Sequence, residues 1–349
     1  RNIGPVARPD IGELADVVDK EHLGAGLKKA ESSLEKTEKF YYPNKKLRKT
    51  VRTKGSRTVE VKEYSKTGLL LTDTMYRDDD ILTEKYFGSG EIRRKTLKAY
   101  TDNPVMAFLS REDFYDSGKT RYEIRRTPDT LLFADKSFAP DGSLQQETAQ
   151  ISPLAFTVKE YGKGGKLAKV TRQLGANILA ETYASDGKIS ALSLNGAAMP
   201  LNLAKNTESL LKDNLKTYAK NGAVASEFKT DAKKDTLLEY YPDGKVKTEI
   251  AFYRNGEIDV KAYDKEGGLE KSAFLAPDGK LHLQKPSART IPSYRERYWV
   301  DYNNPRWIEN QDKYSVKSIG RLNLDTAAYI LAELEADVPE ILKKLYEFY

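Results

Sequence analysis

The amino-acid sequence predicts a mainly β protein, an elongated meander of antiparallel β-hairpins of about 22 residues per repeat, with α-helical segments at both ends. Three observations lead to this prediction. Aromatic residues recur four positions before a glycine, many of these glycines end turn-forming triplets, and the segments between turns alternate apolar and polar side chains. Alternation with a period of two is typical of strands that are buried on one face only.

The repeat is defined by nine pairs of an aromatic residue and a glycine four positions later. The pairs are Tyr64 and Gly68, Tyr86 and Gly90, Phe114 and Gly118, Phe138 and Gly142, Tyr161 and Gly165, Tyr183 and Gly187, Tyr218 and Gly222, Tyr240 and Gly244, and Tyr263 and Gly267. Successive glycines are 22, 28, 24, 23, 22, 35, 22 and 23 residues apart, which indicates a fixed period with two insertions.

Turn chemistry explains why the glycines recur. In Pro242-Asp243-Gly244 a proline presets φ, an aspartate forms the turn and a glycine accepts a positive φ. The following Val246 to Ile250 alternates in the manner of a half-buried strand. We interpret Tyr41 with Lys45 as a degenerate earlier copy in which lysine stands at the glycine position.

The segments Tyr240 to Lys247 and Phe252 to Ile258 resemble the MORN-variant repeat, of the kind found in proteins described as YwqK-like antitoxin components. The resemblance covers roughly residues 40 to 283. Turns such as Tyr263-Asp264-Lys265-Glu266-Gly267 are also similar, more weakly, to the YD repeats of Rhs-type proteins. Both resemblances imply a meandering antiparallel sheet and neither implies catalysis.

The array is expected to be open. A closed β-propeller is the alternative, because two hairpins of 22 residues supply the four strands of one blade. The two insertions break the even spacing that closure requires, and an open repeat array offers an extended face for binding.

Residues outside the repeat are expected to be helical. We assign residues 1–39 to an N-terminal helical cap, 40–283 to the hairpin array, with a helical insertion near 203–216 protruding from one hairpin, and 284–349 to an aromatic-rich linker and a C-terminal helical cap over a sheet edge. Asp325 is predicted to cap a helix running through Ala336. A second helix after Pro339 is predicted to bury Val338, Ile341, Leu342 and Leu345.

Composition narrows the function classes. The 349 residues include no cysteine, which excludes disulfides, thiolate metal sites and a cysteine nucleophile. The net charge of +6 comes from interspersed charges of both signs, and no apolar run is long enough to span a membrane. Together with a start at Arg1 rather than Met, these features favour an extracytoplasmic protein, periplasmic or secreted, although a trimmed cytosolic chain has the same features.

No catalytic residue, metal site or cofactor is predicted. The only histidines, His22 and His282, lie far apart in the sequence and in no recognisable catalytic motif. Gly162 to Lys166 lacks the Ser/Thr of a phosphate loop and is interpreted as a hairpin turn. The many carboxylates leave open a glycosidase-type pair assembled from adjacent hairpins.

Two surface segments are the candidate binding sites. The first is aromatic and basic and comprises Arg295, Arg297, Tyr298, Trp299, Tyr302 and Trp307, which could anchor a protein partner or stack on a sugar. The second is a basic run without an acidic residue, comprising Lys45, Lys46, Arg48, Lys49, Arg52, Lys54 and Arg57. The basic run lacks the interleaved aromatic residues of single-stranded nucleic-acid binders, so a nucleic-acid partner is not expected.

These observations favour a noncatalytic binding or scaffolding protein of the bacterial cell envelope that uses the repeat sheet as a protein-interaction platform. Two alternatives stay open. One is an enzyme that binds or hydrolyses envelope polysaccharide with carboxylates on adjacent hairpins. The other is a toxin-neutralising partner, which only the family resemblance suggests.

Overall fold

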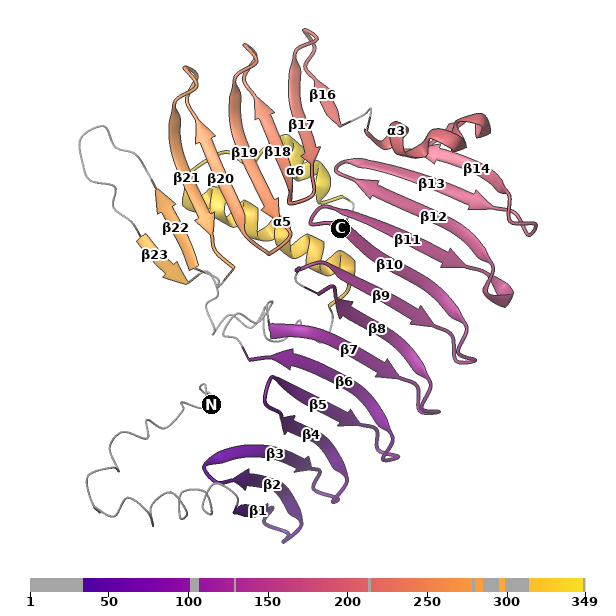
Figure 1. Ribbon diagram of the computed structural model, residues 1–349, viewed down its shortest axis with the longest axis vertical. Coiled ribbons are helices and arrows are strands. Elements are labelled where there is room, and N and C mark those ends of the chain that lie inside the picture. Colours follow the sequence, from indigo (N-terminus) through magenta and orange to yellow (C-terminus); the bar gives the residue numbers. More distant parts are fainter. Residues whose placement is uncertain are drawn as a thin grey trace, which may run out of the picture. The chain divides into compact units, whose positions relative to one another are not determined.

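The structure is a computed structural model that describes residues 34–100, 107–128, 130–212, 215–277, 280–284, the backbone of 295–298, 314–347 and 349. The chain divides into two units, residues 1–77 and 78–349. Both are built from consecutive antiparallel strands (Figure 1). The expected N-terminal helices lie outside the described residues.

The first unit contains four strands that pair in chain order. They are β1 (Glu35–Tyr41), β2 (Leu47–Lys54), β3 (Arg57–Tyr64) and β4 (Leu70–Tyr76). Among the described residues the first strand therefore begins at Glu35, five residues before the expected boundary at residue 40. All seven side chains of β1 are exposed, so this strand lacks the apolar alternation that identifies a half-buried strand.

The second unit contains two sheets. In the first sheet the strands are β5 (Asp80–Tyr86), β6 (Ile92–Ala99), β7 (Phe108–Phe114), β8 (Thr120–Arg126), β9 (Phe133–Phe138), β10 (Leu144–Ser152), β11 (Ala155–Tyr161), β12 (Leu167–Leu174), β13 (Asn177–Tyr183), β14 (Ile189–Leu194) and β15 (Ala197–Met199). In the second sheet they are β16 (Lys216–Tyr218), β17 (Val224–Thr230), β18 (Lys234–Tyr240), β19 (Val246–Tyr253), β20 (Ile258–Tyr263), β21 (Leu269–Leu275), β22 (Lys280–Gln284) and β23 (Arg295–Tyr298). Each sheet keeps the order of the sequence, which confirms the open meander over the closed propeller.

The helical insertion separates the two sheets of the second unit. It consists of η3 (Leu201–Asn206) and α3 (Thr207–Lys212), and it packs Leu211 against Leu179 and Leu192 of the first sheet. The sequence interpretation of a helix protruding from one hairpin of a single array was therefore wrong. The 35-residue spacing between Gly187 and Gly222 also contains the short β14–β15 hairpin, whose Asn195-Gly196 turn lies outside the aromatic-glycine pattern.

The repeating turn has one geometry throughout. At Tyr241 to Lys245, the Gly244 N–H donates to the Tyr241 carbonyl at 2.9 Å and the Tyr241 N–H donates to the Lys245 carbonyl at 2.8 Å. Gly244 has a φ of 87°, as a type I turn followed by a left-handed residue requires. The expected degenerate copy closes in the same way, with Lys45 at a φ of 65°.

Side chains also link several turns to the next one along the sheet. The lysine that follows the turn donates to a carbonyl of the next turn, at 2.9 Å from Lys46 to Thr67, from Lys119 to Asp141 and from Lys245 to Lys265. A tyrosine hydroxyl at the start of the turn does the same at 2.8 Å, from Tyr42 to Tyr64, from Tyr115 to Phe138 and from Tyr241 to Tyr263. These bonds span about one period, so the repeat length in the sequence matches the spacing of bonded turns in space.

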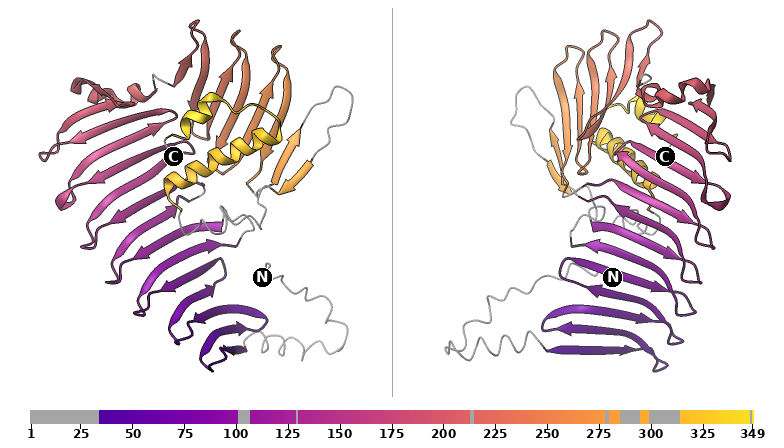
Figure 2. Two further views of the ribbon diagram at one scale, coloured as in Figure 1. Left: turned by 180° about the vertical axis from the view of Figure 1, so that it is seen from behind. Right: turned by 45° about the vertical axis from the view of Figure 1, so that its right-hand side comes forward.

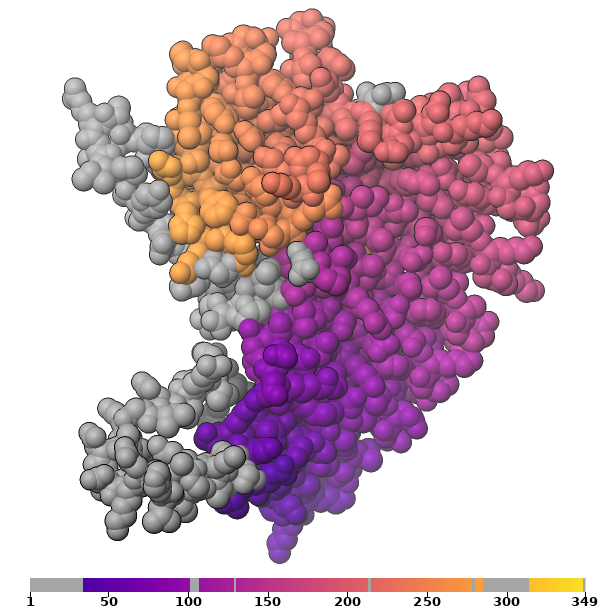
Figure 3. Space-filling view, viewed as in Figure 1, coloured from indigo at the N-terminus to yellow at the C-terminus, as the bar shows by residue number. Residues whose placement is uncertain are grey.

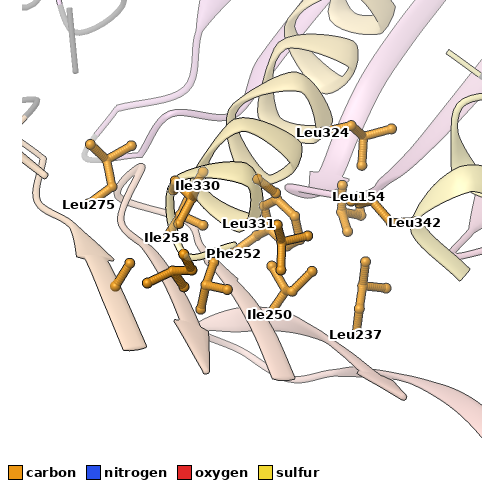
Figure 4. Packing of buried hydrophobic residues seen from close by; sticks show 14 of the residues in the cluster. Leu154, Leu237, Ile250, Phe252, Ile258, Leu275, Leu324, Ile330, Leu331 and Leu342 are labelled. Atoms are coloured by element: carbon orange, nitrogen blue, oxygen red, sulfur yellow. The ribbon is translucent and has the colours of Figure 1, made fainter. Parts of the chain in front are cut away.

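The C-terminal helices cover a face of the second sheet, where the sequence interpretation placed them at an edge. They are α5 (Val316–Glu333) and α6 (Glu340–Leu345), and they lie across one side of the sheet (Figure 2). Figure 4 shows Ile330 and Leu331 of α5 beside Ile250, Phe252 and Ile258 of the sheet, and Leu324 of α5 beside Leu154. Ile341, Leu342 and Leu345 of α6 are buried as predicted.

The start of α5 was predicted incorrectly at Asp325. Ser315 is the N-cap, and its hydroxyl accepts from the Ser318 N–H while the Ser318 hydroxyl accepts from the Ser315 N–H. The usual form of this motif has Glu or Gln at the position of Ser318, so the sequence signal was weak. Asp135 from β9 also accepts from the Val316 N–H at 2.8 Å, which adds a carboxylate to the positive end of the helix.

Asp235 joins the two sheets of the second unit. Its fully buried carboxylate accepts from the Ser152 hydroxyl at 2.6 Å and from the Leu154 N–H at 2.7 Å, both from the β10–β11 connection. Burial raises the pKa of Asp235 although these hydrogen bonds oppose the shift.

No helix among the described residues is long and apolar enough to cross a membrane.

The turn geometry predicts the effect of Gly244→Ala. We expect a loss of about 1 to 2 kcal/mol in the free energy of unfolding, because an L-residue is strained at a φ of 87°. No atom lies within 4 Å of the added Cβ, so a clash does not contribute. Gly88→Ala is the control, since this Cβ also meets open space and Gly88 does not have a positive φ. Equal losses in urea denaturation would contradict the backbone explanation.

The buried carboxylate predicts a pH effect of Asp235→Asn. A raised folded pKa means that the folded state binds more protons, so the contribution of Asp235 to stability falls as pH rises from the ordinary pKa near ~3.9 towards the folded one. The stability difference between the variant and wild type should therefore move in favour of the variant as the pH rises above the ordinary carboxyl pKa.

Asp243→Asn serves as a control of opposite sign. A hydrogen bond from the Lys245 N–H lowers the pKa of this exposed carboxyl, so the stability of its variant relative to wild type should fall as the pH rises towards the ordinary carboxyl pKa and stay constant above it. Chemical denaturation at several pH values measures both differences. Parallel pH profiles for the two variants would contradict the assignment.

Candidate interaction surfaces

The basic run does not form one continuous patch. Lys45 and Lys46 lie in the turn before β2, and the Lys46 amine is bonded to the next turn. Along β2, Arg48 and Lys49 are adjacent residues and so point to opposite faces of the sheet. Arg52, which has no acidic neighbour in the sequence, lies 3.4 Å from both Glu35 and Glu60 on the flanking strands.

Lys54 and Arg57 stand directly opposite each other across the β2–β3 pair. The Arg57 guanidinium donates to the Arg77 carbonyl. The seven predicted residues are therefore divided between a turn and two faces, and cross-strand carboxylates compensate part of their charge.

The aromatic segment lies mostly outside the described residues. Arg295, Arg297 and Tyr298 belong to β23, whose backbone pairs with β22, and Trp299, Tyr302 and Trp307 fall outside the described part of the chain. Its role as a binding site stays a prediction.

The second sheet presents a surface that the sequence analysis did not single out. Adjacent cross-strand rows of this sheet have opposite character. One row is apolar and faces the helices: Phe228, Leu237, Ile250, Val260, Ala273 and Leu283. The next row is mainly polar and belongs to the other side: Lys216, Glu227, Leu238, Glu249, Lys261 and Ser272.

We call the side of β16–β22 that faces away from α5 the open face; Figure 3 looks onto it. A further row on this face contains Lys229, Thr236, Ala251, Asp259, Phe274 and His282. Phe274 is exposed, and its ring centroid lies 6.2 Å from that of His282. The strand alternation in the sequence contains this information, but only the strand register brings these residues together.

Hydrogen bonds and ion pairs fix the polar side chains of the open face. The Tyr240 hydroxyl donates to Glu227 at 2.8 Å, and Lys216 and Lys229 lie 3.5 and 3.4 Å from the same carboxylate. Burial and the Glu227 carboxylate raise the pKa of Tyr240 to about 12. Burial would raise the pKa of Glu227, but the Tyr240 hydroxyl and Lys229 outweigh it and lower that pKa. The open face is therefore a fixed array of tyrosines, lysines and carboxylates at ordinary pH.

One pair of carboxylates on adjacent strands resembles the pair that a glycosidase needs only in its residue types. Glu112 and Glu123 stand directly opposite each other across the β7–β8 pair, and Arg125 lies 3.8 and 3.5 Å from them. A shared cation bridges this pair on a strand surface, whereas a glycosidase needs its two carboxyl groups on either side of a sugar. In the described part of the chain, no group of three or more His, Asp or Glu side chains could hold a metal ion.

Gly162 to Lys166 forms a hairpin turn, as predicted, in which the Gly162 N–H donates to the Lys166 carbonyl at 2.8 Å. His282 lies on β22, and His22 falls outside the described residues.

Comparisons with known proteins agree with the repeat assignment. The family model described as "MORN repeat variant" matches residues 34–54 and 236–255. The first match covers β1 and β2, and the second begins in β18 and extends past the end of β19. No curated protein matched the sequence.

Solved structures also match. A chain described as "Crystal Structure of TcdB2-TccC3" is 14% identical, with 76% of this chain and 16% of that chain covered and a TM-score of 0.21. A second, "Crystal Structure of TcdB2-TccC3-Cdc42", is 12% identical with the same coverage and TM-score. This chain thus spans about a sixth of those chains. The MORN matches support a repeat-based binding role, without identifying a partner.

Proposed function

We propose that this protein is a noncatalytic scaffold that binds a protein partner on the open face of its second sheet. The observation that carries the proposal is the contrast between the two sides of this sheet. One side is closed by α5 and α6, while the other presents charged side chains in ordered rows together with the exposed ring of Phe274. Exposed aromatic residues surrounded by a polar rim are typical of protein-binding surfaces.

The rigidity of the open face supports binding over catalysis. Helices behind the sheet hold its strands, and ion pairs such as Lys261 with Asp259 at 2.9 Å orient its side chains. A preorganised surface loses little conformational entropy when a partner docks. We further propose that the partner is a protein of the bacterial cell envelope, an inference that rests on the absence of cysteine and the basic balance of the sequence.

Site-specific photocrosslinking tests the surface. A benzoylphenylalanine placed at Phe274 in living cells should yield a discrete adduct of defined mass, because Phe274 is exposed on the open face. Leu201 is the matched control, since it is also an exposed apolar residue but lies on η3, outside the sheet. Mass spectrometry identifies the partner in the adduct.

A charge change tests specificity. Lys229→Glu should reduce the adduct at position 274 by at least roughly tenfold, because the two positions share one face and a reversed charge repels a complementary partner. Lys205→Glu on η3 should leave the adduct unchanged. Equal adducts at positions 274 and 201, or none at 274, would contradict the proposed surface. Recovery of the protein only in the cytoplasmic fraction would contradict the envelope assignment alone.

A further inference from the structure

Strand β1 is a long strand at the edge of its sheet. It has seven residues, all of them exposed, and the first unit's strand order places β2 on one side of it. Among the described residues no strand pairs with its other side. The backbone N–H and C=O groups along such an edge are available to pair with an added strand.

Two end strands of the second unit, β15 and β16, differ from β1. Strand β15 has three residues and is followed directly by the packed segment η3 and α3, and β16 also has three residues. Short edge strands are a common device against unwanted pairing between sheets. Strand β1 lacks this device, although the family match at residues 34–54 identifies it as a regular repeat strand.

The sequence of the edge is complementary to itself when reversed. Residues 34 to 40 read Leu-Glu-Lys-Thr-Glu-Lys-Phe. If two copies pair antiparallel about Thr37, each Glu35 stands opposite a Lys39 and each Lys36 opposite a Glu38. Leu34 then stands opposite Phe40. Every charged residue of the segment faces an opposite charge, and the apolar residues meet at the two ends.

Only one twofold register pairs every charged residue of this segment with an opposite charge. Alternate residues of an edge strand direct their backbone groups outward, so a symmetric antiparallel pair must be centred on a residue. Centring on Lys36 places two lysines in contact, and centring on Glu38 places two glutamates in contact. The register about Thr37 avoids every like-charge pair, and like charges directly opposite are destabilising.

The charges are available for such contacts. The side chains of Lys36, Glu38 and Glu35 are 72%, 49% and 55% exposed, although Lys36 and Glu38 lie 2.7 Å apart and Glu35 lies 3.4 Å from Arg52. A row of lysines alone would protect an edge by repulsion. Alternating signs in an inverted order instead favour an identical strand as the partner.

We infer that two copies of this protein associate through β1, antiparallel and centred on Thr37, in a twofold symmetric dimer. The sheet of the first unit then continues from one copy into the other. A closed twofold interface uses the same surface on both copies and ends the array without an open edge. The contact is small, so the dimer should form reversibly in the micromolar range.

The test uses two full-length variants with opposite charge. Lys36→Glu with Lys39→Glu gives an edge bearing only glutamates, and Glu35→Lys with Glu38→Lys gives an edge bearing only lysines. Sedimentation over roughly 1 to 300 µM should show wild type rising from 39.4 kDa towards twice that mass. Each variant alone should associate at least tenfold more weakly, and an equimolar mixture should recover the dimer.

Lys163→Glu with Lys188→Glu is the matched control, because it makes the same charge change in exposed turns of the second unit. This control should dimerise like wild type. Circular dichroism and thermal unfolding check that all variants fold. If the wild type stays monomeric throughout the range, the inference is wrong. This holds also if the reason is that other residues of the same chain cover the edge of β1. A dimer that both charge variants leave intact would also overturn it.

A single cysteine gives an independent measure of the register. The chain contains no cysteine, so Thr37→Cys introduces the only thiol. Two copies of residue 37 would face each other on the twofold axis, within reach of a disulfide. Mild oxidation should yield a covalent dimer, whereas Thr67→Cys, in an exposed turn, should remain monomeric. Equal crosslinking of both variants would exclude pairing about Thr37.

Discussion

The fold depends on the tight turn that closes each hairpin. Its left-handed residue lets the chain reverse within a few positions, and the lysine and tyrosine beside it bind the next turn along the sheet. One local geometry therefore sets the strand length, the period and the contact between neighbours.

A linear array of such hairpins cannot bury both faces of its sheet, and the second unit solves this problem with helices. The apolar row of the second sheet is covered by α5 and α6, and Leu179 and Leu192 of the first sheet are covered by α3. Covering one face leaves the opposite face to solvent, which is why polar residues such as Glu227 and Lys261 occupy it. The same packing that stabilises the sheet thus creates the surface that we propose for binding.

Local features of the fold could be predicted from the sequence, and long-range features could not. The turns at Gly244 and Lys45 follow from residue preferences within five positions, so the hairpin meander was predictable. The way in which the two sheets are joined was not, because it depends on Asp235 bonding Ser152 and Leu154 some 80 residues away. The start of α5 was missed for a similar reason, since Asp135 completes its N-terminus from a distant strand.

The candidate surfaces depend even more on long-range features that the sequence alone does not reveal. The basic run appeared continuous because sequence order ignores that Arg48 and Lys49 face opposite ways and that Glu35 and Glu60 flank Arg52. The open face could not be located from the sequence, because Lys229 and Phe274 are 45 residues apart and share a face only through four strand registers. Strand β1 differs from the open face, because its charge order is visible in seven consecutive residues. That order indicates pairing with a second copy only once the strand is known to lie at an edge. In a repeat protein, charge complementarity therefore indicates an external partner mainly at the end strands, because each strand inside the array already pairs with two neighbouring strands.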